Sequence, residues 1–233
     1  MEKITSSALS LATLGMPGGA QETGAIKGIY HAICRGYKQA NETEYLSLFP
    51  RLQQLRADVS GKLAGTLAQL EAYMDSLCED KWDQLAHNVV TDVGVNAMLD
   101  AALAGSSYTV AGPYMGLIGA ASFSAAPAAG NTMASHAGWT EAGATNAPTY
   151  TAPRKTIAWN AASARAKAPS TAPVFAMTGT GTVKGVFLVF GSGALSTIDN
   201  TAGVLYSAGL FTGGDQPVVN TNTVTVTYST SMT

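Results

Sequence analysis

Four runs rich in β-branched residues close the chain, and they restrict its fold more than any other feature of the sequence. They cover residues 173–178, 181–190, 203–210 and 217–230, with Gly, Ser, Asn and Asp between them. The last run alternates strictly, so that Val224, Val226 and Tyr228 share one face while mainly threonines occupy the other. We therefore predict an antiparallel meander with one buried face and one face that is wetted or shared with a partner.

The charge distribution divides the chain into two different parts. Residues 1–100 contain eight basic and twelve acidic side chains, whereas residues 101–233 contain five basic and three acidic ones. The first part is rich in Glu, Gln, Leu and Lys, which favour helices, and the second in Gly, Thr, Ser, Val and Ala. This order predicts helices first and strands later, which is an α+β fold.

The composition excludes several function classes. A formal net charge of −2 excludes a basic nucleic-acid-binding protein, and 46% hydrophobic against 12% charged residues indicates a chain that folds. No apolar run approaches the roughly 18 residues of a membrane span, and residues 1–16 are too polar for a secretory signal. We expect synthesis in a cytoplasm and no membrane partner. Two cysteines make no disulfide framework, so Cys34 and Cys78 are predicted to be free, buried thiols.

Residues 1–40 are predicted to form an N-terminal arm with a short helix. A glycine-rich segment at 15–19 precedes residues 25–39, where Ile26, Ile29 and Ile33 fall on one side at helical spacing, together with Tyr30.

Residues 41–88 are predicted to form a long helical assembly region. Apolar residues recur here in steps of three and four, which is typical of one amphipathic helix of about 30 residues, roughly 45 Å long. Because this half of the chain is too small to cover such a helix, we expect its stripe to pack against symmetry-related copies. Packing on the chain's own β domain is the alternative. The stripe provides the predicted interface residues Leu52, Leu55, Val59, Leu63, Leu67, Leu70 and Met74.

Residues 89–233 are predicted to form the β domain. A second, shorter helix is expected over 92–103 and a strand over 108–118. The low-charge stretch 120–149 is predicted to be a long loop, and loops of this length are usually functional or held by a partner. Trp139 and Trp159 are predicted interface anchors, with core packing as the alternative for either.

The sequence offers only weak candidates for catalysis. Ser135, His136 and Glu141 have the side-chain types of a hydrolase triad, but no Gly-x-Ser-x-Gly elbow is present, so a hydrogen-bonded loop around Trp139 is favoured. The glycines of 179–185 (GTGTVKG) lie inside a strand pattern, which predicts a hairpin turn and a bulge instead of a nucleotide site. We therefore predict no catalytic residue and no cofactor.

Two further groups of polar side chains stand out, one of metal-ligand type and one basic. The first consists of His31, Cys34, Cys78 and His87. Its spacing matches no zinc-ligand signature, so packing is expected instead of metal binding. The second consists of Arg154, Lys155, Arg165 and Lys167. It suits an acidic neighbouring surface, or it is a solvated loop.

Several segments resemble structural proteins of tailed bacteriophage particles. The most specific are 132–141 (TMASHAGWTE) and 203–229 (GVLYSAGLFTGGDQPVVNTNTVTVTYS), and with 88–105 (NVVTDVGVNAMLDAALAG) and 114–118 (YMGLI) the resemblance covers about 145 residues. They look like small virion proteins of the head-decoration, cement or head-fibre class. The resemblance implies a β-sandwich or jelly-roll-like domain, commonly trimeric, that binds the capsid or another virion part and catalyses nothing.

These observations predict a structural, non-enzymatic virion component. It would be a homotrimer that binds the major capsid protein or another virion protein, as a decoration or cement protein that stabilises the shell. A low-charge β domain suits this role because it offers flat faces for many small contacts. One alternative is a tail-fibre or adaptor component with a host-facing β domain, and another is a hydrolase acting on surface polysaccharide or peptide. We expect the protein in the virion, after synthesis in the host cytoplasm.

Overall fold

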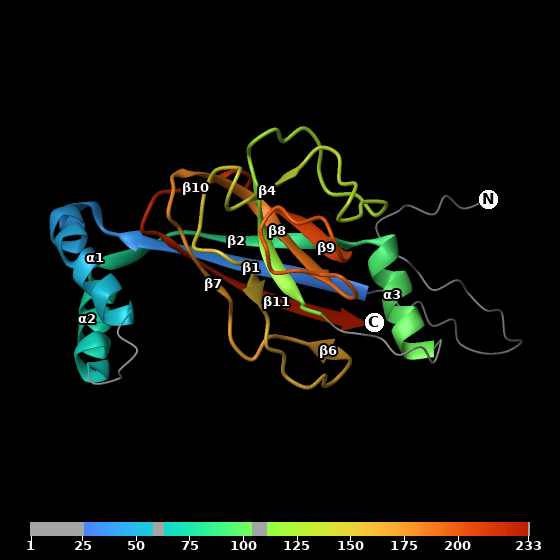
Figure 1. Cartoon of the computed structure of the whole chain (residues 1–233), viewed down its shortest axis with the longest axis horizontal. Helices are drawn as coiled ribbons and strands as arrows, with labels where there is room; N and C mark the ends of the chain where they lie inside the picture. The colour runs from blue at the N-terminus through green and yellow to red at the C-terminus, as the bar shows by residue number, and fades with distance from the viewer. Residues whose placement is uncertain (1–25, 58–62, 104–110, 233) are drawn as a thin grey trace, which may run out of the picture.

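The computed structural model describes residues 26–57, 63–103 and 111–232, and it combines helices with an antiparallel sheet, as the predicted α+β class requires (Figure 1). The helices are α1 (Glu42–Ala57), α2 (Ala64–Ser76) and α3 (Asp92–Leu103), with a short 3-10 turn η1 (Gln39–Asn41) before α1. The longer strands are β1 (Ile26–Tyr37), β2 (Cys78–Val90), β3 (Tyr114–Gly119), β8 (Gly181–Phe190), β9 (Val204–Phe211) and β11 (Thr223–Met232). The shorter strands are β4 (Thr140–Ala142), β5 (Lys155–Thr156), β6 (Ala166–Lys167), β7 (Val174–Ala176) and β10 (Gln216–Val218).

All these strands belong to one hydrogen-bonded sheet. Its order is β4-β3-β8-β9-β2-β1-β11-β6, with β10 on β8, β5 on β3 and β7 on β11. The predicted two-layer sandwich or jelly-roll is therefore not confirmed. The strands at both ends of this order, β4 and β6, have only three and two residues.

The sheet curls around its main core. β3 and β11 are separated by four strands, yet Leu117 of β3 and Val226 of β11 belong to one buried cluster. Neighbouring strands lie about 4.8 Å apart, so a flat sheet would keep these residues well separated. At the centre of the cluster the rings of Tyr30 and Tyr228 lie 4.6 Å apart. Gly28 leaves room for them, because a Cβ there would meet the Tyr228 hydroxyl.

Strand β8 is buried on both faces. Val186 and Leu188 join the main core, whereas Phe187 and Val189 belong to a second cluster on the opposite face. The loop that follows β3 covers this second cluster with Trp139, whose ring lies 5.5 Å from that of Phe187. Burial on both faces explains the nearly continuous apolar run of β8.

Helices occupy the two ends of the molecule (Figure 1). The hairpin of α1 and α2 connects β1 to β2 at one end, and α3 follows β2 at the other. β2 pairs with β9 only through Ala86–Val90. The start of β2, which pairs with the end of β1, therefore continues past β9 to the hairpin. β11 pairs with β1 as far as Arg35, so only the last two residues of β1 extend past β11 before the helical hairpin at this end of the molecule.

Strands form in the predicted runs of the second half of the chain, but the predicted meander is wrong. β2 and β1 lie between β9 and β11, β7 pairs with β11, and the last predicted run contains two strands, β10 and β11. β8, β9 and β11 lie within the predicted runs to within two residues, and α3 covers the predicted helix 92–103. Val224, Val226 and Tyr228 of β11 are buried, as their alternation predicts.

The predicted short helix over 25–39 is wrong, because residues 26–37 form β1. Its inward face consists of Gly28, Tyr30, Ala32, Cys34 and Gly36, all buried. Small side chains on the buried face and isoleucines on the other concealed the alternation and imitated helical spacing. The strand is favoured because β1 pairs with β2 on one side and with β11 on the other, and because its two glycines disfavour a helix.

The predicted single helix within 41–88 is also wrong. α1 ends at Ala57, α2 begins at Ala64, and residues 78–90 form β2. The apolar stripe continues through both helices because each buries one face against the other. In β2 the run of Glu79, Asp80 and Lys81 is exposed and typical of a helix surface, whereas only Ala86 of this strand is fully buried. Residue 88 is consequently no boundary of the sheet, since β1 and β2 pair within it.

Candidate interaction surfaces

The hairpin of α1 and α2 has a small apolar core of its own. Tyr45 and Leu52 of α1 pack with Met74 of α2 and with Leu77. The helices run in opposite senses, since Glu44 near the start of α1 accepts from the Tyr73 hydroxyl, whereas Arg56 near the end of α1 pairs with Glu71, further back along α2, at 2.9 Å. This core fixes the two helices together before any partner binds.

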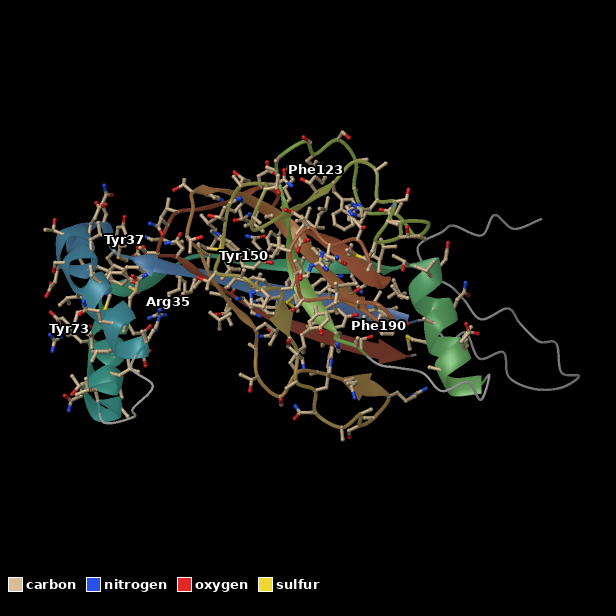
Figure 2. All side chains as sticks on the ribbon, viewed as in Figure 1. Arg35, Tyr37, Tyr73, Phe123, Tyr150 and Phe190 are labelled. Atoms are coloured by element: carbon tan, nitrogen blue, oxygen red, sulfur yellow. The ribbon has the colours of Figure 1, made fainter. Side chains whose placement is uncertain are left out.

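The predicted interface stripe is divided between this core and the surface. Leu52, Leu55 and Met74 are buried, Leu67 and Leu70 are half-buried, Leu63 is 45% exposed, and Val59 lies outside the described residues. Most of the stripe therefore packs within the chain's own hairpin. Other large apolar side chains face solvent instead: besides Leu63, these are Leu46 and Tyr73, exposed by 43% and 47%. Tyr73 lies at the hairpin end of the molecule (Figure 2).

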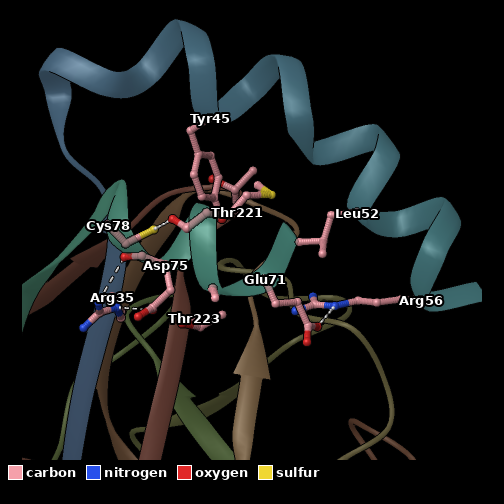
Figure 3. A pocket seen from close by; sticks show the side chains of 11 residues that line it. Arg35, Tyr45, Leu52, Arg56, Glu71, Asp75, Cys78, Thr221 and Thr223 are labelled. Atoms are coloured by element: carbon pink, nitrogen blue, oxygen red, sulfur yellow. Dashed lines mark hydrogen bonds and ion pairs between the residues drawn. The ribbon is translucent and has the colours of Figure 1, made fainter. Parts of the chain in front are cut away.

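A cavity of about 450 Å³ separates the hairpin from the sheet (Figure 3). Its charged side chains are paired: Arg35 Nε lies 2.8 Å from Asp75 Oδ1, and Arg56 binds Glu71. The Thr221 hydroxyl, in contrast, is buried without a hydrogen-bond partner among the described residues. Because each arginine is matched by a carboxylate, the described residues that line the cavity carry no net charge.

The two cysteines lie in different environments. Cys34 is fully buried, and its thiol donates to Asn222 Oδ1 at 3.6 Å. Burial raises the pKa of this thiol to about 12. Cys78 lies half-buried in the hairpin cavity, where its thiol donates to the Met74 carbonyl oxygen. Burial also raises the pKa of Cys78.

We expect iodoacetamide at neutral pH to alkylate Cys78 at least about tenfold faster than Cys34, because thiolate formation and access both favour Cys78. Peptide mass spectrometry at timed intervals measures both rates. The Cys78→Ser variant is the control, since it should lose only the fast reaction. Equal rates in the native chain would contradict the burial of Cys34.

An apolar groove of about 640 Å³ lies beside α3, and we call it the aromatic groove. Ala97, Met98 and Ala101 of α3 form one wall. Trp159, Tyr206 and Tyr228 contribute aromatic surface from the sheet side, with the Trp159 and Tyr228 rings 6.0 Å apart. Phe190 also lines it, near the α3 end (Figure 2). Among the described residues, Lys167 of β6 is the one charged side chain that lines the groove. Large aromatic side chains around an open apolar hollow are typical of protein interfaces.

The two predicted tryptophan anchors differ. Trp139 is 2% exposed and donates through Nε1 to Asn131 Oδ1 at 3.0 Å, so it packs in the second cluster. Trp159 is half-buried and lines the aromatic groove. Of the two, only Trp159 remains accessible to a partner.

A buried ion pair holds three segments together, and we call it the Arg154–Glu141 clamp. Arg154 binds both carboxylate oxygens of Glu141, at 2.8 Å through Nε and 2.6 Å through Nη2. It also donates to the carbonyl oxygens of Leu195 and Asn200. The Asp199 backbone N–H donates to Glu141 as well. Burial raises the pKa of the Glu141 carboxyl, while Arg154 acts in the opposite direction.

The clamp leaves the hydrolase candidates without a working arrangement. His136 and Glu141 line the same cavity of about 140 Å³, but Arg154 and Asp199 occupy the Glu141 oxygens. His136 Nδ1 lies 3.1 Å from the Trp139 carbonyl oxygen, and its ring stacks on Trp139. Among the described residues no hydrogen bond joins His136 to Ser135 or to Glu141. The favoured sequence interpretation, a hydrogen-bonded loop around Trp139, matches this geometry.

The structure also places the two groups of polar side chains that stand out in the sequence, the His and Cys group and the basic group. No group of three or more potential ligands is found in the part of the chain that the structure describes, and His31 pairs with Asp83 at 2.6 Å. Within the basic cluster, Arg154 is buried in the ion pair with Glu141, and the Lys155 ammonium group lies over the Tyr150 ring. Arg165 and Lys167 have no ion-pair partner among the described residues. None of the described helices is long and apolar enough to cross a membrane.

Comparison of the sequence with protein-family models and with curated proteins found no match, and no solved structure matches the chain.

Proposed function

We propose that this protein is a structural, non-catalytic component of a tailed phage particle, which binds the capsid surface as a decoration or cement protein. The proposal rests on the sequence resemblance and on one structural observation, the placement of the α1–α2 hairpin at the far end of the β1–β2 ribbon. The curled sheet, whose distant strands meet across one core, is the feature closest to the predicted jelly-roll-like domain.

The hairpin has the properties of a docking element. Its own apolar core keeps it folded on the ribbon, while Leu46, Leu63 and Tyr73 remain exposed on it. We take three large exposed apolar side chains on one small helical element as support for a docking role. Proteins that decorate a shell gain binding energy from such surfaces and need no deep pocket.

The experiment uses particles that lack this protein, to which the purified full chain is added back. We expect the chain to sediment with the particles and immunogold label to lie over the head. Leu46→Glu and Leu63→Asp should weaken particle binding by about tenfold or more, because they place charges in the contact. Leu195→Asp is the matched control, since Leu195 is 48% exposed but lies on a loop of the sheet.

Label at the tail or at a vertex would replace the cement role with the tail-fibre or adaptor alternative. Absence of the protein from particles would overturn the proposal, and so would equal losses for the hairpin variants and Leu195→Asp.

A further inference from the structure

We infer that the aromatic groove receives the outer face of α3 from a second copy of this chain, with Leu99 inserted between Met98 and Trp159 and with acidic residues of α3 facing Lys167. This contact concerns the purified chain alone and does not depend on a role in a virion.

The first observation is that α3 has two unlike faces. Ala97 and Ala101 line the groove, whereas Leu99 is two residues from each of them and so lies on the opposite side of the helix. Leu99 is 43% exposed. Asp100, Asn96 and Asp92 surround it at spacings of one, three and seven residues, respectively, and all three are exposed. One helix therefore presents a single apolar side chain within an acidic, polar surface, and a hollow on its reverse side.

The second observation is that the groove complements this outer face in shape and charge. Its aromatic walls offer an apolar hollow for one aliphatic side chain, and Lys167 is the charged residue that lines it. Arg165, exposed and two residues before Lys167, adds a second positive charge on the same short loop. Asp92 and Asp100 likewise have no ion-pair partner among the described residues. Opposite charges that flank an apolar contact favour one register of association over others.

The geometry also indicates the type of assembly. Because the projecting face and the groove lie on opposite sides of α3, each copy can use both at once, with different neighbours. Such a head-to-tail contact forms a closed ring when the rotation between copies closes. The predicted homotrimer is then a ring with one such contact between each pair of neighbours.

The test is sedimentation velocity of the purified full chain over a range of concentrations at low salt. We expect a trimer that dissociates on dilution. Lys167→Glu and Asp100→Lys should each weaken association by about tenfold or more, because each places like charges face to face. The double variant Lys167→Glu/Asp100→Lys should regain most of the lost affinity, since the opposite charges then meet with exchanged signs. Leu99→Ser should weaken association without such rescue.

Arg51→Glu is the control for charge reversal, because Arg51 is exposed on α1 at the other end of the molecule. It should leave association unchanged, and the far-ultraviolet circular dichroism spectrum of every variant should match that of the native chain, which shows that the fold is kept. A chain that stays monomeric at all concentrations would overturn the inference. So would an assembly that survives both single reversals, or a double variant that is no better than either of them. Particle binding is measured separately, so either proposal can fail without the other.

Discussion

Replacing Arg154 with methionine is expected to lower the free energy of unfolding by about 3–5 kcal/mol, the cost of breaking a buried ion pair on one side only. Arg154 is 1% exposed and Glu141 6%, so the remaining carboxylate would lose its partner in an environment that water does not reach. The substitution also removes the donors for the Leu195 and Asn200 carbonyl oxygens, and it leaves the Asp199 N–H as the remaining bond from the 195–200 loop to Glu141 of β4. Urea unfolding followed by circular dichroism measures the change.

Two controls separate the buried charge from a general effect of losing an arginine. Arg165→Met removes an exposed arginine that has no ion-pair partner among the described residues, and it should change stability by no more than about 0.5 kcal/mol. The double variant Arg154→Met/Glu141→Leu removes both charges, and it should be more stable than Arg154→Met alone. A double variant that loses the sum of two large single effects would contradict the assignment of the cost to an unpaired charge.

The clamp itself could not be read from the sequence, although a signal for it was present. Glu141 is one of three acidic residues after position 100, and Arg154 lies thirteen positions further on. An isolated acid and an isolated base in a low-charge region are candidates for a buried pair, because an unpaired charge is rarely buried. From the sequence, Glu141 was a weak candidate for a catalytic triad and Arg154 a member of a basic cluster. Their pairing was not predicted, since only the folded loops bring the two side chains together.

The fold was predictable where one periodicity dominates. β8 and β11 join long β-branched runs to a clear buried face, and α3 has apolar spacing followed by a glycine-rich stop, so local pattern and final structure agree. β1 and β2 were missed because their buried positions hold small or polar residues and their strand state depends on distant partners. β1 pairs with β11, nearly 200 positions away in the sequence. Long-range pairing of this kind overrides local propensity.

The interface predictions were incomplete for the same reason, because local sequence patterns do not show which distant residues a side chain contacts. The stripe from Leu52 to Met74 was recognised as a buried seam, but a stripe does not reveal whether its partner is another chain or the next helix. Trp159 was recognised as an anchor because of its size alone, whereas the groove around it also requires Met98 of α3 and Tyr228 of β11. Sequence reasoning therefore found side chains of the right type, and the structure supplied the surfaces they form.

Raising the pH is expected to unfold the protein at about pH 11, because its core contains phenols that ionise only after unfolding. Burial raises the pKa of Tyr30, Tyr150 and Tyr228 well above the value of an exposed phenol, and it raises the pKa of the Cys34 thiol to about 12. In the unfolded chain the thiol loses its proton at about pH 8.5 and the phenols at about pH 10. Above those values the unfolded state binds fewer protons than the native state, so stability falls as pH rises.

The expected size of the effect follows from the number of groups. Each buried phenol removes about 1.4 kcal/mol per pH unit above about pH 10, so the three together remove about 4 kcal/mol per unit. Domains of ordinary stability, about 5–15 kcal/mol, do not withstand this loss for more than a few units. Circular dichroism and near-ultraviolet phenolate absorbance should therefore change together, as the buried phenols ionise on unfolding. Phenolate formation by all tyrosines before any loss of structure would contradict this prediction.

Tyr150→Phe isolates one phenol in this transition. The Tyr150 hydroxyl is buried and has no hydrogen-bond partner among the described residues, so its removal should cost no stability at neutral pH and should add about 1 kcal/mol. The same variant should lose stability with pH less steeply, by about 1.4 kcal/mol per unit, because one ionisable group has left the core. Tyr30→Phe gives a contrasting result: it reduces the slope similarly but lowers stability at neutral pH, since the Tyr30 hydroxyl lies 2.6 Å from the Ser207 hydroxyl and would leave that group unpaired. An unchanged alkaline slope in both variants would contradict a contribution of these two phenols to the transition.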